Sequence, residues 1–171
     1  MIALLVTALV LCLPALLVTA AVSDIVTFTI PNWIALTLLA LFPVAALAAG
    51  LPPLVIAQNF GVGVGLLAVG VAMFALRWAG GGDAKLLAAA GLWLGWDAMP
   101  TFLLSVAMTG GLLSLMLLTL RSEAVRPVAM LGPRWVNRLA DPTEGIPYGV
   151  AIAVGACMAL TASPFGAALR F

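Results

Sequence analysis

The chain is divided into apolar runs that are each nearly long enough to cross a bilayer. Six such runs can be drawn, at residues 1–22, 33–51, 54–77, 84–99, 101–120 and 147–165. A transmembrane helix needs about 20 consecutive apolar residues. Lipid admits only helices and closed barrels, because the backbone must satisfy its own hydrogen bonds there. The runs therefore predict an all-α polytopic membrane protein of about six transmembrane helices, forming one membrane-embedded domain over residues 1–171.

The composition agrees with a membrane protein and argues against other classes. Hydrophobic residues make up 65% of the chain and charged residues 8%, whereas an ordinary soluble domain has about 25% charged residues. The net charge of +1 provides no basic face for nucleic acid, which we exclude as a partner. Cys12 and Cys157 stand alone in apolar runs and there is no histidine, so the spacing of a zinc site is missing. We expect no metal and no other cofactor.

The connections between the runs differ in charge, which predicts the orientation of the chain. Arg77 and Lys85 flank the third connection, and four arginines lie in the polar stretch 121–146, whereas the opposite side keeps only Arg170. Positive residues collect in cytoplasmic loops. The third connection and residues 121–146 are therefore predicted to be cytoplasmic. Counting spans places the first connection on the same side and both termini outside.

Two aspartates stand at this predicted cytoplasmic face. Asp24 ends the first apolar run, and Asp83 follows three glycines at the start of the fourth. An ionisable group at bilayer depth costs about 2.5–3.5 kcal/mol at a helix centre, so such residues are candidates for function. Two carboxylates that share one proton can hydrolyse a peptide bond: the ionised one takes a proton from water and the protonated one polarises the carbonyl. We predict Asp24 and Asp83 to be such a catalytic dyad.

Other interpretations of the same aspartates remain open. Asp83 could be the N-cap of a helix that begins at Ala84, worth about 1 kcal/mol, and Asp24 could be an interfacial loop residue. The pair could also form a proton relay in a small transporter, although no two similar halves with broken helices are visible. A third alternative is a non-catalytic assembly protein of a secretion apparatus.

The end of the fourth run predicts the depth of Asp83. From Asp83 to Trp96 the helix would be about 21 Å long at 1.5 Å per residue, shorter than the hydrocarbon core of about 30 Å. Trp93, Trp96 and Asp97 are expected at the outer interface, because tryptophan favours the headgroup level. Asp83 would then lie several ångströms inside the cytoplasmic leaflet, or the bilayer would be thinner there. The alternative is a helix that continues past Asp97 to Pro100 and buries Asp97; we favour the first.

Residues 121–146 are too polar to span the membrane. Arg134–Leu139 could form one or two amphipathic turns on the membrane surface. We expect this stretch to be a linker rather than a substrate gate.

Three short blocks of the sequence resemble a known family. They are Asp24 with Ile30-Pro31-Asn32, then Gly80-Gly81-Gly82-Asp83-Ala84-Lys85-Leu86, and finally Ile146-Pro147-Tyr148-Gly149 at the start of the last run. In this order they are similar to the small prepilin peptidases of Flp/Tad-type pilus systems, which belong to the GxGD membrane aspartic proteases. One departure is the stretch 25–29, which is neutral here and tends to be basic in relatives.

The resemblance implies a function and a location. It implies catalysis by Asp24 and Asp83 at the cytoplasmic face of the bacterial inner membrane. It also implies a prepilin substrate that has a short basic leader ending in glycine, followed by a hydrophobic helix that stays in the bilayer. The pilus assembly machinery would be a further partner. Longer relatives also methylate the new N-terminus through a cysteine-rich region that nothing here matches, so the chain resembles the peptidase alone.

The residues expected to bind substrate or support the dyad lie beside it in these blocks: Gly81, Gly82, Lys85, Pro31, Asn32 and Pro147. Glycines let a backbone approach a substrate closely. Lys85 is expected to anchor its helix by snorkelling, or to favour the charged form of Asp83. Purified protein mixed with a pilin precursor would separate the enzyme from the transporter and the assembly protein, because only a peptidase shortens the precursor without an ion gradient.

The orientation can be tested by labelling in a variant that lacks Cys12 and Cys157. A cysteine introduced as Thr27→Cys or Asn137→Cys should be protected from an impermeant thiol reagent added outside intact cells, because positive loops stay inside. Phe171→Cys should be labelled. Outside labelling of Thr27→Cys would place Asp24 on the wrong face.

Overall fold

The computed structural model describes residues 2–166, so Arg170 and Phe171 of the orientation argument lie outside the described residues. Within this range the chain has no strand and consists of α1 (Ile2–Thr27), α2 (Asn32–Ala48), α3 (Pro53–Ala75), α4 (Gly81–Leu120), α5 (Arg126–Ala129), α6 (Arg134–Leu139), α7 (Tyr148–Ala159) and the short 3-10 helix η1 (Leu160–Ala162). Helices α1, α3 and α4 are long and apolar enough to cross a membrane, and two shorter apolar helices accompany them. This confirms the predicted all-α polytopic membrane fold.

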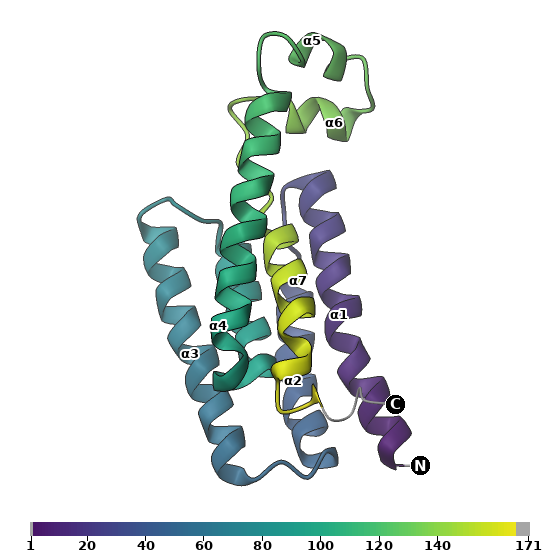
Figure 1. The fold of residues 1–171 in the computed structure, drawn as a ribbon, viewed down its shortest axis with the longest axis vertical. Helices are drawn as coiled ribbons and strands as arrows, with labels where there is room; N and C mark the ends of the chain where they lie inside the picture. Colours follow the sequence, from purple (N-terminus) through teal and green to yellow (C-terminus); the bar gives the residue numbers. More distant parts are fainter. Residues whose placement is uncertain (1, 167–171) are drawn as a thin grey trace.

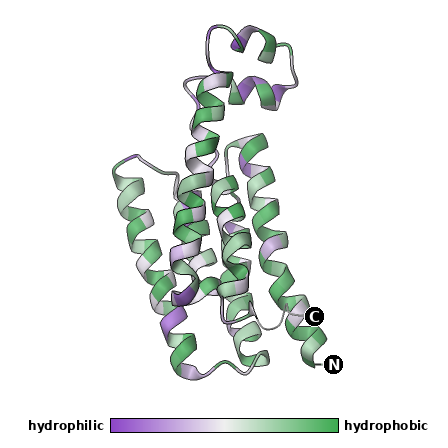
Figure 2. Ribbon diagram, viewed as in Figure 1, coloured by the Kyte–Doolittle hydropathy of each residue, from purple (hydrophilic) through white to green (hydrophobic). Residues whose placement is uncertain are grey.

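The long helices lie side by side, and their polar connections collect at one end (Figure 1). The connections after α1 and α3 lie at the end of the bundle that also carries α5 and α6, and the N-terminus lies at the opposite end. Hydrophilic residues are concentrated in the α5–α6 segment, while the bundle below is mostly apolar (Figure 2). The connections that the charge pattern assigned to the cytoplasm therefore share one end of the molecule.

Helix α4 is broken at Gly95, which has the non-helical backbone angles φ 71° and ψ −177°. The break divides α4 into a first arm, residues 81–94, and a second arm, residues 96–120, which returns toward the α5–α6 end (Figure 1). The predicted runs 84–99 and 101–120 placed the boundary between two helices at residue 100. Pro100 instead lies one turn into the second arm, where a proline removes only a single helical hydrogen bond.

A buried asparagine on α3 completes this break. A carbonyl left unpaired inside a bilayer costs several kcal/mol, and the broken helix frees the carbonyls at the end of the first arm. Asn59 is 2% exposed, and its side-chain nitrogen donates a hydrogen bond to the carbonyl of Leu92 at 3.0 Å. A Cβ atom on Gly95 would lie 2.6 Å from the Asn59 side-chain oxygen. Only glycine fits this turn.

Trp93 lies in the core, so its predicted position at the outer interface is wrong. The side chain is fully buried, its indole nitrogen donates to the carbonyl of Leu38 at 2.9 Å, and its ring meets Phe42 edge-on with centroids 6.0 Å apart. Trp96 and Asp97, just beyond the break, are exposed. The break separates residues that an unbroken helix would have kept together, and it leaves Trp93 facing α2.

The turn at Gly95 can be tested by adding one methyl group. We expect Gly95→Ala to destabilise the protein by about 1–3 kcal/mol, because its backbone region is essentially restricted to glycine and the methyl group would meet Asn59. Thermal unfolding in detergent, followed by tryptophan fluorescence, measures the change. Gly65→Ala is the matched control: its Cβ would have nothing within 4 Å, and alanine is the better helix former. Equal unfolding temperatures for the two variants would contradict this account.

Candidate active site

Asp24 lies in the last turns of α1 and is held by the start of α7. The side chain is 6% exposed, and its Oδ2 accepts a hydrogen bond from the backbone N–H of Gly149 at 2.7 Å. A Cβ atom on Gly149 would lie 2.9 Å from that oxygen, so a glycine is needed for this approach. Pro147 is the N-cap residue of α7, and the positive end of the helix dipole favours a carboxylate there.

Asp83 lies in the first turn of α4, where its Oδ2 accepts a hydrogen bond from the N–H of Gly80 at 3.0 Å. This is one half of a capping box in which Gly80, and not Asp83, is the N-cap. Each aspartate thus uses one oxygen to accept a backbone N–H. Within residues 2–166 the Oδ1 atoms of Asp24 and Asp83 accept no hydrogen bond from protein, which leaves one oxygen on each for a ligand or water.

Ile30 packs against the start of α4, which carries Asp83, and against the start of α7, which binds Asp24. A Cβ atom on Gly82, next to Asp83, would lie 3.0 Å from the Ile30 Cβ, and one on Gly149 would lie 3.0 Å from the Ile30 Cδ1. The segment after α1 therefore touches the starts of α4 and α7 together, at the glycines that adjoin Asp83 and bind Asp24. The sequence did not indicate Ile30 or the N–H of Gly149 as parts of the site, although both residues stand in the blocks that resemble the family.

Lys85 pairs with α2 and not with Asp83. Its Nζ donates a hydrogen bond to the Asn32 Oδ1 at 2.8 Å, which links the first arm of α4 to the first residue of α2. Pro31 precedes as the N-cap of α2, in an extended conformation. Gly81 lies over the ring of Phe74, which a Cβ atom would approach to 3.6 Å. The predicted supporting residues therefore surround the starts of α2, α4 and α7.

Residues 121–146 are fastened to the bundle next to Asp24. Arg138 donates to the carbonyl of Thr27 at 3.3 Å, stacks over the Phe28 ring at 5.0 Å and forms an ion pair with Glu144 at 2.9 Å. Phe28 itself has a positive φ of 54°, a conformation that bulky residues rarely adopt. Helix α6 forms over the predicted amphipathic stretch Arg134–Leu139. The segment is more than a linker, since it holds the turn that follows Asp24.

A second arginine fastens the same segment to α4. Arg121 donates from Nε to the carbonyl of Leu139 at 2.9 Å and from Nη2 to the carbonyl of Gly145 at 2.8 Å. Nearby, the backbone N–H and the hydroxyl of Thr143 donate to Asp141 and hold the pKa of that carboxyl below its usual range. Asp141 thus closes a local turn at the surface.

Residues 11–115 match the type IV leader peptidase family. The chain belongs to that family. The matched region contains Asp24 and Asp83, while Gly149 and Arg138 lie beyond it. Membership confirms the family that the three sequence blocks resembled, and the Flp/Tad subtype stays a prediction.

Two relatives show how much of the family's length this chain shares. A prepilin leader peptidase/N-methyltransferase of Pectobacterium carotovorum subsp. carotovorum is 34% identical over 133 residues, which are 72% of this chain and 46% of the relative. Another of the same name from Aeromonas hydrophila is 35% identical over 80 residues, 41% of this chain and 28% of the relative. The chain therefore spans less than half the length of these relatives. No solved structure matches the chain.

The attachment of residues 121–146 can be tested through Arg138. We expect Arg138→Ala to raise the rate of proteolysis within this segment by about tenfold, because losing a cation–π contact and a charge-assisted hydrogen bond removes about 1–2 kcal/mol of local stability. Limited proteolysis of the detergent-solubilised protein measures it.

Two further variants sharpen this test. Arg138→Lys should give an intermediate rate, since it keeps the charge but loses the guanidinium fork. Arg134→Ala is the control, because Arg134 is exposed and forms no hydrogen bond or ion pair with the described residues. Proteolysis of Arg138→Ala at the rate of the control would show that the contacts of Arg138 do not hold the segment.

Proposed function

We propose that the chain is a membrane aspartic endopeptidase that removes the leader peptides of type IV-like (Flp) prepilins. The observation that carries the proposal is the position of Asp24 on α1 and Asp83 on α4 at the same end of the bundle. Ile30 lies there against both Gly82, next to Asp83, and Gly149, whose N–H donates to Asp24. Membership of the type IV leader peptidase family supports it. The relatives are named for prepilin leader processing, which gives the class of substrate.

The proposed reaction uses one shared proton and one water molecule. The ionised carboxylate of the pair removes a proton from water, whose oxygen bonds to the scissile carbonyl carbon while the protonated carboxyl donates to the carbonyl oxygen. When the tetrahedral intermediate collapses, the C–N bond breaks and the leaving amine takes the proton that the first carboxylate removed from water. The second carboxylate recovers its own proton from the hydroxyl of the intermediate, so the pair again holds one proton. The proton belongs to the pair rather than to either residue. The N–H groups of Gly149 and Gly80 orient the two carboxylates by their Oδ2 atoms.

The proposed location is the cytoplasmic face of a bacterial inner membrane. The connections at the dyad end carry Arg77 and the arginines of residues 121–146, and Lys85 lies in the first turns of α4 beside them. Positive residues collect on the cytoplasmic side. A prepilin whose basic leader is cytoplasmic and whose helix is embedded would present its cleavage site at this level. The bilayer and a prepilin are thus the proposed partners, and the pilus assembly machinery is a further one.

The dyad is tested by changing each carboxylate to its amide. Asp24→Asn and Asp83→Asn keep an oxygen that accepts the N–H of Gly149 or Gly80, but neither can share a proton. We expect each variant to lose leader removal by about 10²–10⁴-fold or more, the range of general acid–base catalysis. Purified variants and a prepilin in mixed micelles, with cleavage followed by mass spectrometry, measure it.

The control for the dyad is Asp97→Asn, which removes an exposed carboxylate beside the break at Gly95. It should cleave at the wild-type rate. Near-normal cleavage by Asp83→Asn would leave that aspartate with its capping role alone and would refute the proposed dyad.

We propose leader removal without methyl transfer for this chain. The three blocks that resemble the peptidase account for Asp24, Asp83 and the start of α7, and no block resembles the cysteine-rich region of the bifunctional relatives. Purified protein given a prepilin and S-adenosylmethionine should yield a mature pilin with a free α-amine. A gain of one methyl group at the new N-terminus by mass spectrometry, with no second enzyme present, would contradict this.

A further inference from the structure

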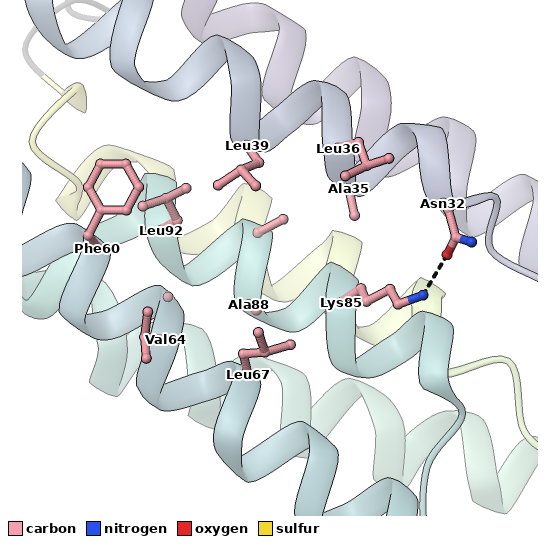
Figure 3. Close-up of a pocket in the computed structure, with 12 residues that line it drawn as sticks. Asn32, Ala35, Leu36, Leu39, Phe60, Val64, Leu67, Lys85, Ala88 and Leu92 are labelled. Atoms are coloured by element: carbon pink, nitrogen blue, oxygen red, sulfur yellow. Dashed lines mark hydrogen bonds between the residues drawn. The ribbon is translucent and has the colours of Figure 1, made fainter.

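An apolar groove opens on the side of the bundle between α2 and α3. Its volume is about 560 Å³, and the first arm of α4 forms its floor (Figure 3). Helices α2 and α3 both pack on α4. They meet each other at the edge-on pair of Phe42 and Phe60, whose ring centroids are 5.4 Å apart, and few other positions of the two helices come close. The walls carry Leu36 and Val64, whose side chains are 62% and 65% exposed. Among the described residues, nothing covers this apolar surface.

The groove has one polar end, and that end is next to the candidate active site. Asn32 and Lys85, joined by their hydrogen bond, lie at one end, and Phe60 and Leu92 lie toward the other (Figure 3). Lys85 is two residues beyond Asp83 in α4. From Lys85 to Leu92 the groove runs about 10 Å along the helix, at 1.5 Å per residue. It is therefore a slot about two helical turns long that starts at the level of the dyad.

We propose that this groove binds the hydrophobic helix of the substrate, an inference that rests on the proposed function. Four of the lining residues are small: Ala35, Gly63, Ala88 and Ala89. Small residues let the backbones of two membrane helices approach closely. A surface that only faces lipid tails has no need of them. A helix in the slot would pack on α2, α3 and the first arm of α4 at once. Its leader end would point to the polar end of the groove, at the level of the aspartates.

The helical turn of α4 determines how the substrate reaches the dyad. Two residues are separated by about 200° around a helix, so Asp83 and the groove-lining Lys85 lie on opposite faces of the first arm. The substrate must therefore leave the groove and cross the N-cap Gly80 and the first residues of α4, Gly81 and Gly82. Crossing a helix about 10 Å wide takes about three extended residues at 3.3 Å each. The scissile bond would then stand about three residues before the docked helix.

Filling the groove tests the inference. The probe is a synthetic precursor with a six-residue lysine-rich leader ending in glycine and a 20-residue apolar helix, and the comparison substrate is the same peptide cut short before the helix. Ala88→Phe should raise KM for the full precursor about tenfold or more and leave kcat unchanged, because it removes apolar binding surface shared by ground state and transition state. Cleavage of the short peptide should not change.

The matched control is Ala107→Phe, which adds the same ring to an exposed position on the second arm, away from the groove. It should cleave both peptides as the wild type does. Wild-type kinetics of Ala88→Phe on the full precursor would overturn the inference while leaving the proposed function intact.

Photo-crosslinking tests the groove without measuring cleavage, and it does not require the Ala88→Phe variant to fold. A benzoyl-phenylalanine at Leu36, in an Asp83→Asn background, should crosslink the apolar helix of the precursor, and one at Leu104, which is 66% exposed on the second arm, should not. Crosslinks from Leu36 to phospholipid alone would identify the groove as a lipid site and overturn the inference. A protein with both aspartates intact could also crosslink the precursor at Leu36 and yet cleave no precursor. That result would support the groove as the binding site and refute the proposed peptidase function.

Discussion

The break in α4 determines where the later part of the chain lies. A straight helix of 40 residues would be about 60 Å long, about twice the thickness of the hydrocarbon core. At Gly95 the chain reverses, and Asn59 takes up the carbonyl of Leu92 that the break releases. The second arm then returns to the end of the bundle where the first arm began. Residues 121–146 and the start of α7 follow it there, which brings Gly149 to Asp24.

Glycine makes the approach at the candidate site possible. Gly82 and Gly149 both lie against Ile30, and Gly149 also lies against the Asp24 carboxylate. A Cβ atom on either glycine would come within about 3 Å of these neighbours, which is too close for a side chain. Each carboxylate is held by a backbone N–H rather than by a basic side chain. A lysine or arginine partner would neutralise the carboxylate that the proposed reaction needs as a base. Backbone donors orient the group without supplying a full positive charge.

The end of the bundle offers two different surfaces beside the proposed dyad. On one side, Arg138 and Arg121 hold the polar segment 121–146 over the end of α1. On another, the groove between α2 and α3 continues along the apolar part of the bundle from Lys85. The apolar helix of the proposed substrate has a matching environment in the groove, whereas residues 121–146 carry four arginines and three acidic residues. The conformation at the cleavage site would have to be extended, because a peptide bond inside a helix is shielded by its own backbone hydrogen bonds.

The sequence by itself determined the class of the protein and the segments of its site. Long apolar runs allow only helices in lipid, the arginine and lysine bias groups the connections, and the blocks around Asp24, Asp83 and Pro147 identify the family. These are local or compositional properties, so they can be read along the chain. Only the tertiary structure decided the break at Gly95 rather than at Pro100, the burial of Trp93, the pairing of Lys85 with Asn32, and the contacts of Arg138. Each depends on a partner more than 30 residues away, such as Asn59 for Leu92 or Thr27 for Arg138, and no local pattern encodes which distant residue will be that partner.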